Sequence, residues 1–290
     1  MLYTNAADRE FSKHKRLFVI GCSFTHWLWP TWADIIAHEH PHLEYYNFGI
    51  PGQGSDYIQT MLSQIERKYQ LNNNDIVIIM WSSFHRDGIY SLYNPESSEM
   101  ADCIINQTPK MDLIKHAFNW YSTGDAIGQK LIENPANHIC DARGYLIKNL
   151  AIIDSVTKIL QHANYSGAQM LSVGIKDQLK FDTTALESPI DDVLDMYNDI
   201  DDYMLGKCYY DYAGYELDQI VWDDGEEDYH PKSIQYFEYL KQLGFNLSES
   251  TARWCYNADA VVQNARFHRD LEENNDWQYT KYPMNRECPL

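Results

Sequence analysis

The chain has 290 residues, of which 44% are hydrophobic and 22% are charged, a composition typical of a folded globular protein. Its formal net charge is -19, from 42 acidic and 23 basic residues, and such a charge repels nucleic-acid phosphates and anionic lipid surfaces. We therefore expect neither a nucleic acid nor a membrane as a partner.

The sequence also predicts where the protein resides. It contains no run of about 18 apolar residues, and its polar N-terminus lacks the apolar core of a signal peptide. These features lead us to expect a cytoplasmic protein. The six cysteines are scattered without a Cys-x-x-Cys pair, which predicts free thiols and no zinc ribbon.

Four short apolar segments predict core strands, at residues 16–21, 44–48, 75–81 and 168–174. The continuous apolar run "IVIIM" in the third segment is typical of a strand that is buried on both faces, as in a parallel sheet.

Helical patterns lie between and after these segments, at residues 29–40, 55–69, 145–163, 230–243 and 248–267. Strands that alternate with helices predict an α/β protein, a three-layer α/β/α sandwich with a mostly parallel sheet. We expect a single domain over residues 1–290. It carries a helical insertion at about residues 90–144, an irregular stretch at 176–228 and a C-terminal extension at about 245–290.

The stretch "LFVIGCSFT" places Ser23 directly after the first strand. Ligands of parallel sheets collect beyond the carboxyl ends of the strands, and a helix that begins soon after Ser23 would point backbone N–H groups at a ligand. Ser23 is therefore a candidate nucleophile. Alternatively, it only caps the next helix. The stretch is not the Gly-x-Ser-x-Gly elbow of α/β-hydrolases, because Thr25 stands at the second glycine position.

Two further loops follow predicted strands. In "NFGIPGQGS", the N–H group of Gly52 is a candidate donor to an anionic oxygen, although the loop could also be an ordinary connection. In "IIMWSSFHR", the side chains of Ser82, Ser83, His85 and Arg86 could contact a substrate carbonyl or carboxylate, or could simply form a polar loop.

A fourth candidate lies in "DDGEEDYHPKS", just before the helical pattern at 230–243. A catalytic histidine needs a carboxylate that holds its tautomer, and either Asp228 or Glu227 is close enough in sequence to serve His230. The alternative is a solvated acidic loop.

Two other patterns are less informative. His38, His40 and His42 could bind a metal, but Pro41 interrupts the helix that would align them, so we expect no metal site there. The acidic run at residues 191–203 lacks the glycine and glutamate of a calcium-binding loop, and we interpret it as a solvated face.

Taken together, the blocks resemble the SGNH (GDSL-type) hydrolase family. Gly21-Cys22-Ser23 matches its nucleophile block, Asn47, Gly49 and Gly52 match its glycine loop, and Asp228 and His230 match its last block. The resemblance covers about residues 17–243 and is nearest to SGNH-like proteins of phages and bacteria. It implies a flavodoxin-like sheet and, in a phage setting, a virion-associated protein.

The resemblance further implies a serine-dependent ester hydrolase, with an O-acylated carbohydrate as a candidate substrate. Its catalytic residues would be Ser23, His230 and Asp228, its oxyanion donors Ser23, Gly52 and Ser83, and it would need no cofactor or metal. The substrate would be a small-molecule or glycan ester.

The sequence departs from the family at three positions. Cys22 replaces an aspartate, Ser83 is the nearest residue to an expected asparagine, and the last block is Asp-x-His where Asp-x-x-His is usual. The alternative function is therefore a weak or inactive SGNH-fold binding or structural module. A third possibility uses Cys22 as the nucleophile. The sequence does not determine the oligomeric state.

Overall fold

The computed structural model describes residues 11–84, 86, 88–90, 120–122, 142–174, 191–213, 220–223, 225, 227–266 and 271. The protein is an α/β protein built on a four-stranded parallel sheet in the order β2-β1-β3-β6. The strands are β1 (Arg16–Gly21), β2 (Glu44–Gly49), β3 (Asp75–Trp81) and β6 (Ser166–Leu171).

All four predicted strands are thus confirmed. The fourth begins two residues earlier than the prediction and ends at Leu171, because Ser172 leaves the sheet and its N–H and hydroxyl both donate to the Trp81 carbonyl.

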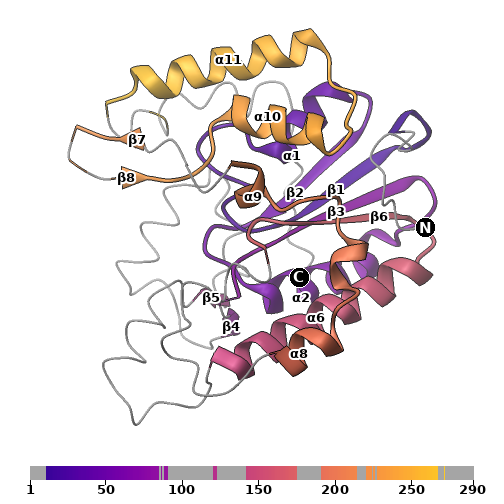
Figure 1. Ribbon diagram of the computed structural model, residues 1–290. Coiled ribbons are helices and arrows are strands. Elements are labelled where there is room, and N and C mark those ends of the chain that lie inside the picture. The colour runs from indigo at the N-terminus through magenta and orange to yellow at the C-terminus, as the bar shows by residue number, and fades with distance from the viewer. Residues whose placement is uncertain are drawn as a thin grey trace.

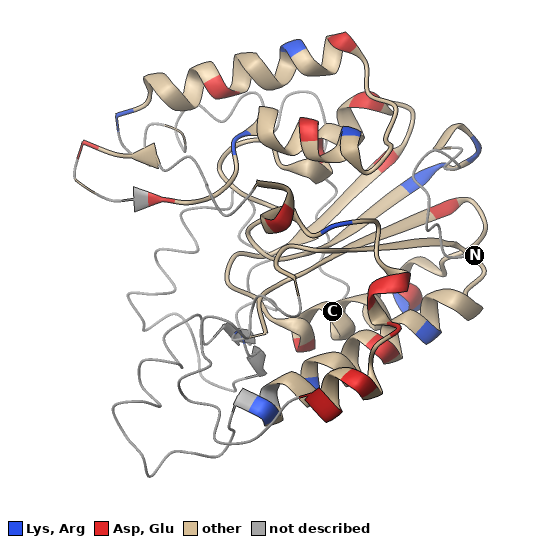
Figure 2. Cartoon of the chain, viewed as in Figure 1, with Lys and Arg blue, Asp and Glu red and all other residues tan. Residues whose placement is uncertain are grey.

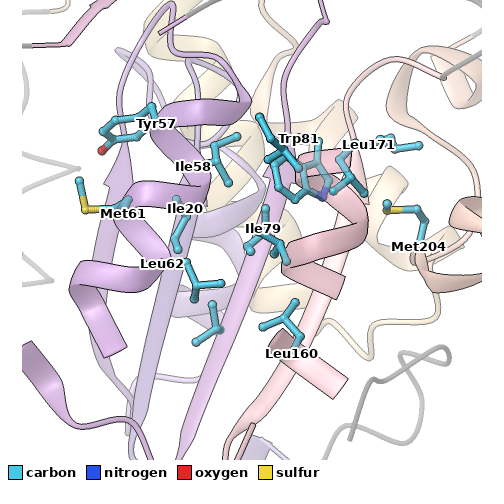
Figure 3. Close-up of a cluster of buried hydrophobic side chains, with 14 of the residues drawn as sticks. Ile20, Tyr57, Ile58, Met61, Leu62, Ile79, Trp81, Leu160, Leu171 and Met204 are labelled. Carbon is cyan, nitrogen blue, oxygen red and sulfur yellow. The ribbon is translucent and has the colours of Figure 1, made fainter. Parts of the chain in front are cut away.

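The sheet is buried on both faces, as the apolar runs predict. All seven residues of β3 are buried. Alternate side chains enter two different clusters, because successive residues of a strand point to opposite faces. Ile20 and Ile79 belong to the cluster that includes Leu62 (Figure 3), whereas Val19 and Ile78 belong to the cluster on the other side.

Helices cover both faces (Figure 1). One face carries α1 (Trp32–Glu39), α9 (Tyr209–Ala213), α10 (Ser233–Gln242) and α11 (Glu249–Asn264). The other carries α2 (Ser55–Tyr69), α6 (Ala142–His162), α8 (Asp191–Met196) and the short helix η5 (Ile200–Tyr203).

The predicted C-terminal extension is in part an element of the core. Helix α11, which the sequence analysis places at 248–267, packs against α10 and α1. Its Cys255 and Val262 side chains are buried, and its Asp259 carboxylate accepts hydrogen bonds from the N–H groups of Ser233 (2.8 Å) and Ile234 (3.0 Å). An acidic side chain of α11 therefore caps the N-terminus of α10.

Two parts of the chain differ from the sequence predictions. Strands β4 (Gly88–Tyr90) and β5 (Trp120–Ser122) form an antiparallel pair, so the insertion at about 90–144 is not purely helical. The rest of that insertion before 142 lies outside the described residues. In the stretch predicted to be irregular, β7 (Ile220–Val221) pairs with β8 (Glu227–Asp228). Pairs this short show no periodicity in the sequence.

The acidic run at residues 191–203 forms α8 and η5, whose aspartates are exposed, so the interpretation as a solvated face is confirmed. Figure 2 shows acidic positions on α8 and beside it.

Cys22, Cys208 and Cys255 are free thiols, as predicted, and the other cysteines lie outside the described residues. Among the helices that the structure describes, none is both long and apolar enough to cross a membrane.

Candidate functional site

The sheet topology brings the candidate loops to one edge. Strand β1 lies between β2 and β3, so the chain turns to opposite sides of β1 as it forms its second and third strands. Such a switch point opens a crevice beyond the carboxyl ends of the strands, where ligands of α/β sheets bind. The loops with Ser23, Gly52 and Ser83 all follow strands at this edge.

Ser23 lies in a tight turn and not at the start of a helix. The N–H groups of Thr25 and His26 donate to the Cys22 carbonyl at 2.9 and 3.2 Å, and α1 begins only at Trp32. The predicted helix at 29–40 therefore starts too early, and no helix begins directly after Ser23. The physical reason is the Asp34 carboxylate, which accepts the Thr31 N–H at 2.9 Å and fixes the helix start there.

A glycine and an asparagine allow this turn to pack closely on strands β2 and β3. A Cβ atom on Gly21 would lie 2.0 Å from Thr25 Oγ1 and 2.9 Å from the Met80 carbonyl oxygen, so only glycine fits. The Asn47 amide donates to the Thr25 carbonyl at 3.0 Å, and its oxygen accepts the Gly49 N–H at 2.8 Å. Asn47 thus ties the Ser23 turn to the end of β2.

The Gly52 loop has the backbone shape that the sequence suggests. Gly52 has a φ of 79°, a conformation that strongly favours glycine. Helix α2 begins three residues later at Ser55, with Gly54 as its N-cap residue and no side-chain cap. The positive end of the α2 dipole therefore lies beside the Gly52 loop.

Asp228 and His230 are in direct contact. The Asp228 Oδ1 atom lies 2.7 Å from His230 Nδ1 and accepts the His230 backbone N–H at 2.8 Å. The Asp228 side chain is buried, whereas the imidazole keeps 19% of its surface exposed. Of the two acids that the sequence offered, the structure brings Asp228 to the imidazole; nothing of the Glu227 side chain is described.

Trp27 completes this pair, and the sequence analysis missed it. Its indole N–H donates to Asp228 Oδ2 at 3.1 Å, and its ring stacks on the His230 ring with centroids 3.6 Å apart and planes 22° apart. The carboxylate of Asp228 thus accepts bonds at both oxygens. Trp27 follows Ser23 by only four residues, but no spacing rule connects it to a histidine 200 residues later.

The histidine loop is docked on the segment that follows β1. The Phe24 and His230 ring centroids are 5.6 Å apart, the Trp29 indole donates to the Pro231 carbonyl at 2.7 Å, and the Ser233 hydroxyl donates to the Pro30 carbonyl at 2.9 Å. The residue next to Ser23 is therefore a neighbour of the imidazole.

A buried cysteine and a buried tyrosine lie close to this turn. Cys22 is buried, and the Tyr236 ring lies edge-on to Phe24 with centroids 6.3 Å apart. Burial is the main cause that raises the pKa of Tyr236 well above its ordinary value, with smaller contributions from nearby groups that include Asp228. This phenol is therefore neutral and acts as a packing element.

Ser83 lies two residues after β3, in the position where the family pattern expects an asparagine. Its carbonyl accepts the Arg86 N–H at 3.2 Å, and the neighbouring Ser82 hydroxyl accepts a bond from the Arg86 guanidinium at 3.2 Å. Ser82 is buried and Ser83 is partly exposed. His85, the other member of this predicted cluster, lies outside the described residues.

The three histidines near residue 40 do not converge on one point. His38 Nδ1 contacts the Thr251 hydroxyl at 2.9 Å, His40 stacks on Phe11, and His42 Nε2 contacts the Phe11 carbonyl at 3.1 Å. Within the part of the chain that the structure describes, no group of three or more His, Cys, Asp or Glu side chains could hold a metal ion.

Comparisons with known proteins do not assign the chain to a family. No protein-family model matches it, and neither the curated proteins nor the solved structures include a significant match. Any assignment therefore depends on the geometry of this edge of the sheet.

Proposed function

We propose that this protein is a serine-dependent ester hydrolase of the SGNH type. The observation that carries the proposal is the Asp228–His230 pair, docked on the turn that holds Ser23. The parallel sheet in the order β2-β1-β3-β6, with helices on both faces, fits the three-layer, flavodoxin-like sandwich that the resemblance implies.

The proposed reaction is acyl transfer to water. Asp228 holds the tautomer of His230 that carries a proton on Nδ1, so Nε2 can accept the proton of the Ser23 hydroxyl as its oxygen attacks the ester carbonyl. The N–H groups of Ser23 and Gly52 stabilise the oxyanion, with Ser83 as a third donor. His230 then protonates the leaving alcohol, and water releases the acyl group by the reverse sequence.

The substrate in this proposal is an ester of a small molecule or of an O-acylated glycan. Exposed aromatic rings bind sugars through their apolar faces. Tyr229, between the two members of the acid–base pair, keeps 51% of its surface exposed.

The second candidate function is an SGNH-fold binding module without turnover, and two observations favour it. Ser23 is only 3% exposed, and a serine replaces the expected asparagine donor after β3. Loss of one oxyanion donor costs about 3 kcal/mol of transition-state stabilisation, so the replacement alone gives a slow enzyme. Cys22 is a poorer nucleophile candidate than Ser23, because its thiol is buried at 1% exposure in an apolar cluster.

The test compares hydrolysis of p-nitrophenyl acetate by the wild type, Ser23→Ala and His230→Ala. We expect each variant to lose a factor of about 100 or more in kcat, since each removes a member of the catalytic unit. The matched controls are Ser155→Ala and His162→Ala on the exposed face of α6, which should hydrolyse at the wild-type rate.

A fluorophosphonate probe gives a second readout. It should label the wild type at Ser23, identified by peptide mass, and should not label His230→Ala. Equal hydrolysis rates for wild type and Ser23→Ala, with no labelling of Ser23, refute the esterase and leave the binding module.

A further inference from the structure

Arg86 has an unusual environment for a partly buried guanidinium group. It follows β3 at the same edge of the sheet as Ser23, and its side chain donates to the Ser82 hydroxyl at 3.2 Å. Its Nε atom is buried and has no hydrogen-bond partner among the described residues. The described part of the chain offers this guanidinium no carboxylate.

Three other arginines of the described part of the chain each have a carboxylate partner. Arg16 pairs with Asp75 at 2.7 Å, Arg143 with Asp192 at 2.6 Å and Arg266 with Asp223 at 2.7 Å. Carboxylates are abundant, since the chain has 42 acidic residues against 23 basic ones. A buried N–H donor without an acceptor is unfavourable, so the buried Nε atom of Arg86, which has no acceptor among the described residues, points to a ligand.

The surrounding contacts fix Arg86 in this place. The Asn149 amide of α6 donates to the Phe84 carbonyl at 3.2 Å and holds the loop. The neighbouring residue Lys148 is paired with Asp56 of α2 at 2.7 Å, so its charge is already neutralised. Arg86 therefore supplies a positive charge to this corner of the site that no described carboxylate offsets.

The loops that carry Ser23 and Arg86 leave neighbouring strands of the sheet. Strands β1 and β3 pair in parallel as far as Ile20 and Ile79, so the Ser23 turn and the loop with Ser82 follow the carboxyl ends of adjacent strands. The hydroxyl that Arg86 contacts thus belongs to the loop that neighbours the Ser23 turn.

We propose that Arg86 forms an anion-binding subsite beside Ser23 and that the ester substrate carries a negatively charged group, a carboxylate or a phosphate. This proposal builds on the proposed function and names the substrate class. A guanidinium group binds both kinds of oxyanion through paired N–H donors. Charges farther from the bound anion than about 8 Å, the screening length at physiological salt, are largely screened. The cation beside the anion therefore has more influence on its binding than the net charge of -19.

The kinetic test uses two esters of equal chain length, 4-nitrophenyl hexanoate and the monoanionic 4-nitrophenyl adipate. A hydrogen bond between charged groups contributes about 1.5–3 kcal/mol, so Arg86→Gln should reduce the adipate-to-hexanoate ratio of kcat/KM by about 10-fold or more. Hexanoate hydrolysis should change by less than about threefold. Arg86→Lys, which keeps the charge, should retain part of the preference. Arg143→Gln is the matched control and should leave the ratio unchanged.

The binding test does not depend on turnover. Adipate and inorganic phosphate are titrated separately into the wild type and Arg86→Gln by calorimetry, after the thermal unfolding of both proteins has shown that they are folded. Binding of either anion that is lost in Arg86→Gln supports the subsite even if no ester is hydrolysed, and the anion that binds more tightly identifies the charged group. Equal binding by both proteins, or no binding of either anion to the wild type, overturns the subsite and leaves the esterase proposal standing.

Discussion

Gly21 gives the sharpest test of how the Ser23 turn is built. An alanine at this position would place its Cβ atom 2.0 Å from Thr25 Oγ1 and 2.9 Å from the carbonyl oxygen of Met80. Ordinary contacts of this kind are at about 3.4 Å or more, and the Met80 carbonyl belongs to β3, so it cannot move without disturbing the sheet. We therefore expect Gly21→Ala to destabilise the protein.

The magnitude follows from the two overlaps. Overpacking costs about 1–3 kcal/mol, and a contact with immobile backbone places Gly21→Ala near the upper end, at about 3 kcal/mol. Thr25→Ala alone should cost about 1 kcal/mol, because it removes a buried methyl group but also a buried hydroxyl that has no partner among the described residues. The double variant should cost only about 2 kcal/mol, since the severe overlap is gone, and the coupling energy is then about 2 kcal/mol.

The assay is a double-mutant cycle by urea unfolding at constant pH, followed by circular dichroism. Gly167→Ala serves as the control, because its added Cβ would meet Leu160 and not Thr25, so its effect should add to that of Thr25→Ala. Additive effects of Gly21→Ala and Thr25→Ala, within about 0.5 kcal/mol, would falsify the steric account of the turn.

Further predictions concern the elements that support the acid–base pair. Asp259→Ala should lower the free energy of unfolding by about 2–4 kcal/mol, because it leaves the N–H groups of Ser233 and Ile234 without their acceptor. Urea unfolding measures this change, and a decrease below about 0.5 kcal/mol would contradict the role of Asp259 as a helix cap. Burial raises the pKa of Asp259, so the folded protein holds this proton more tightly than the unfolded chain, and stability should fall as pH rises from the ordinary value of 3.8 through the raised one. Asp259→Asn should remove that decline, which unfolding curves between about pH 4 and pH 7 would detect as a flatter profile. Trp27→Phe keeps a stacked ring but removes the N–H donor to Asp228, so kcat for p-nitrophenyl acetate should fall about tenfold with little change in KM; an unchanged kcat would show that the indole bond has no role in positioning.

Much of the fold could be predicted from local patterns. A strand such as β3 is short, apolar and bounded by polar residues, and a helix such as α2 has apolar residues at helical spacing. Each of these elements can therefore be predicted from the residues of its own segment. The pair β4–β5 could not be found in this way, because strands of three residues have no measurable period. The predicted start of α1 is too early because it follows from Pro30, whereas the hydrogen bond from the Thr31 N–H to the Asp34 carboxylate sets the first turn of the helix.

The residues of the candidate site also divide into those that the sequence identifies and those that only the structure identifies. Gly21 and Gly52 could be singled out from the sequence because they match glycine positions of the SGNH blocks. The structure supplies the physical reason, a clash of any Cβ atom at Gly21 and a positive φ at Gly52. Trp27 was not, since its partners Asp228 and His230 are 200 residues away in the sequence. Arg86 was visible as one of several polar residues after β3, but its lack of a carboxylate partner is a property of the folded chain.

The sequence by itself determined the parallel strands, most of the helices and the residue types that could carry acyl transfer, because hydrophobic periodicity and glycine placement are local properties. Only the tertiary structure decided which of these residues meet. It brought the Asp228 carboxylate to His230 and placed that pair against the segment after Ser23. It also left Arg86 without a carboxylate partner among the described residues. Contacts between distant segments depend on how the layers pack, and a single sequence carries no direct record of that packing.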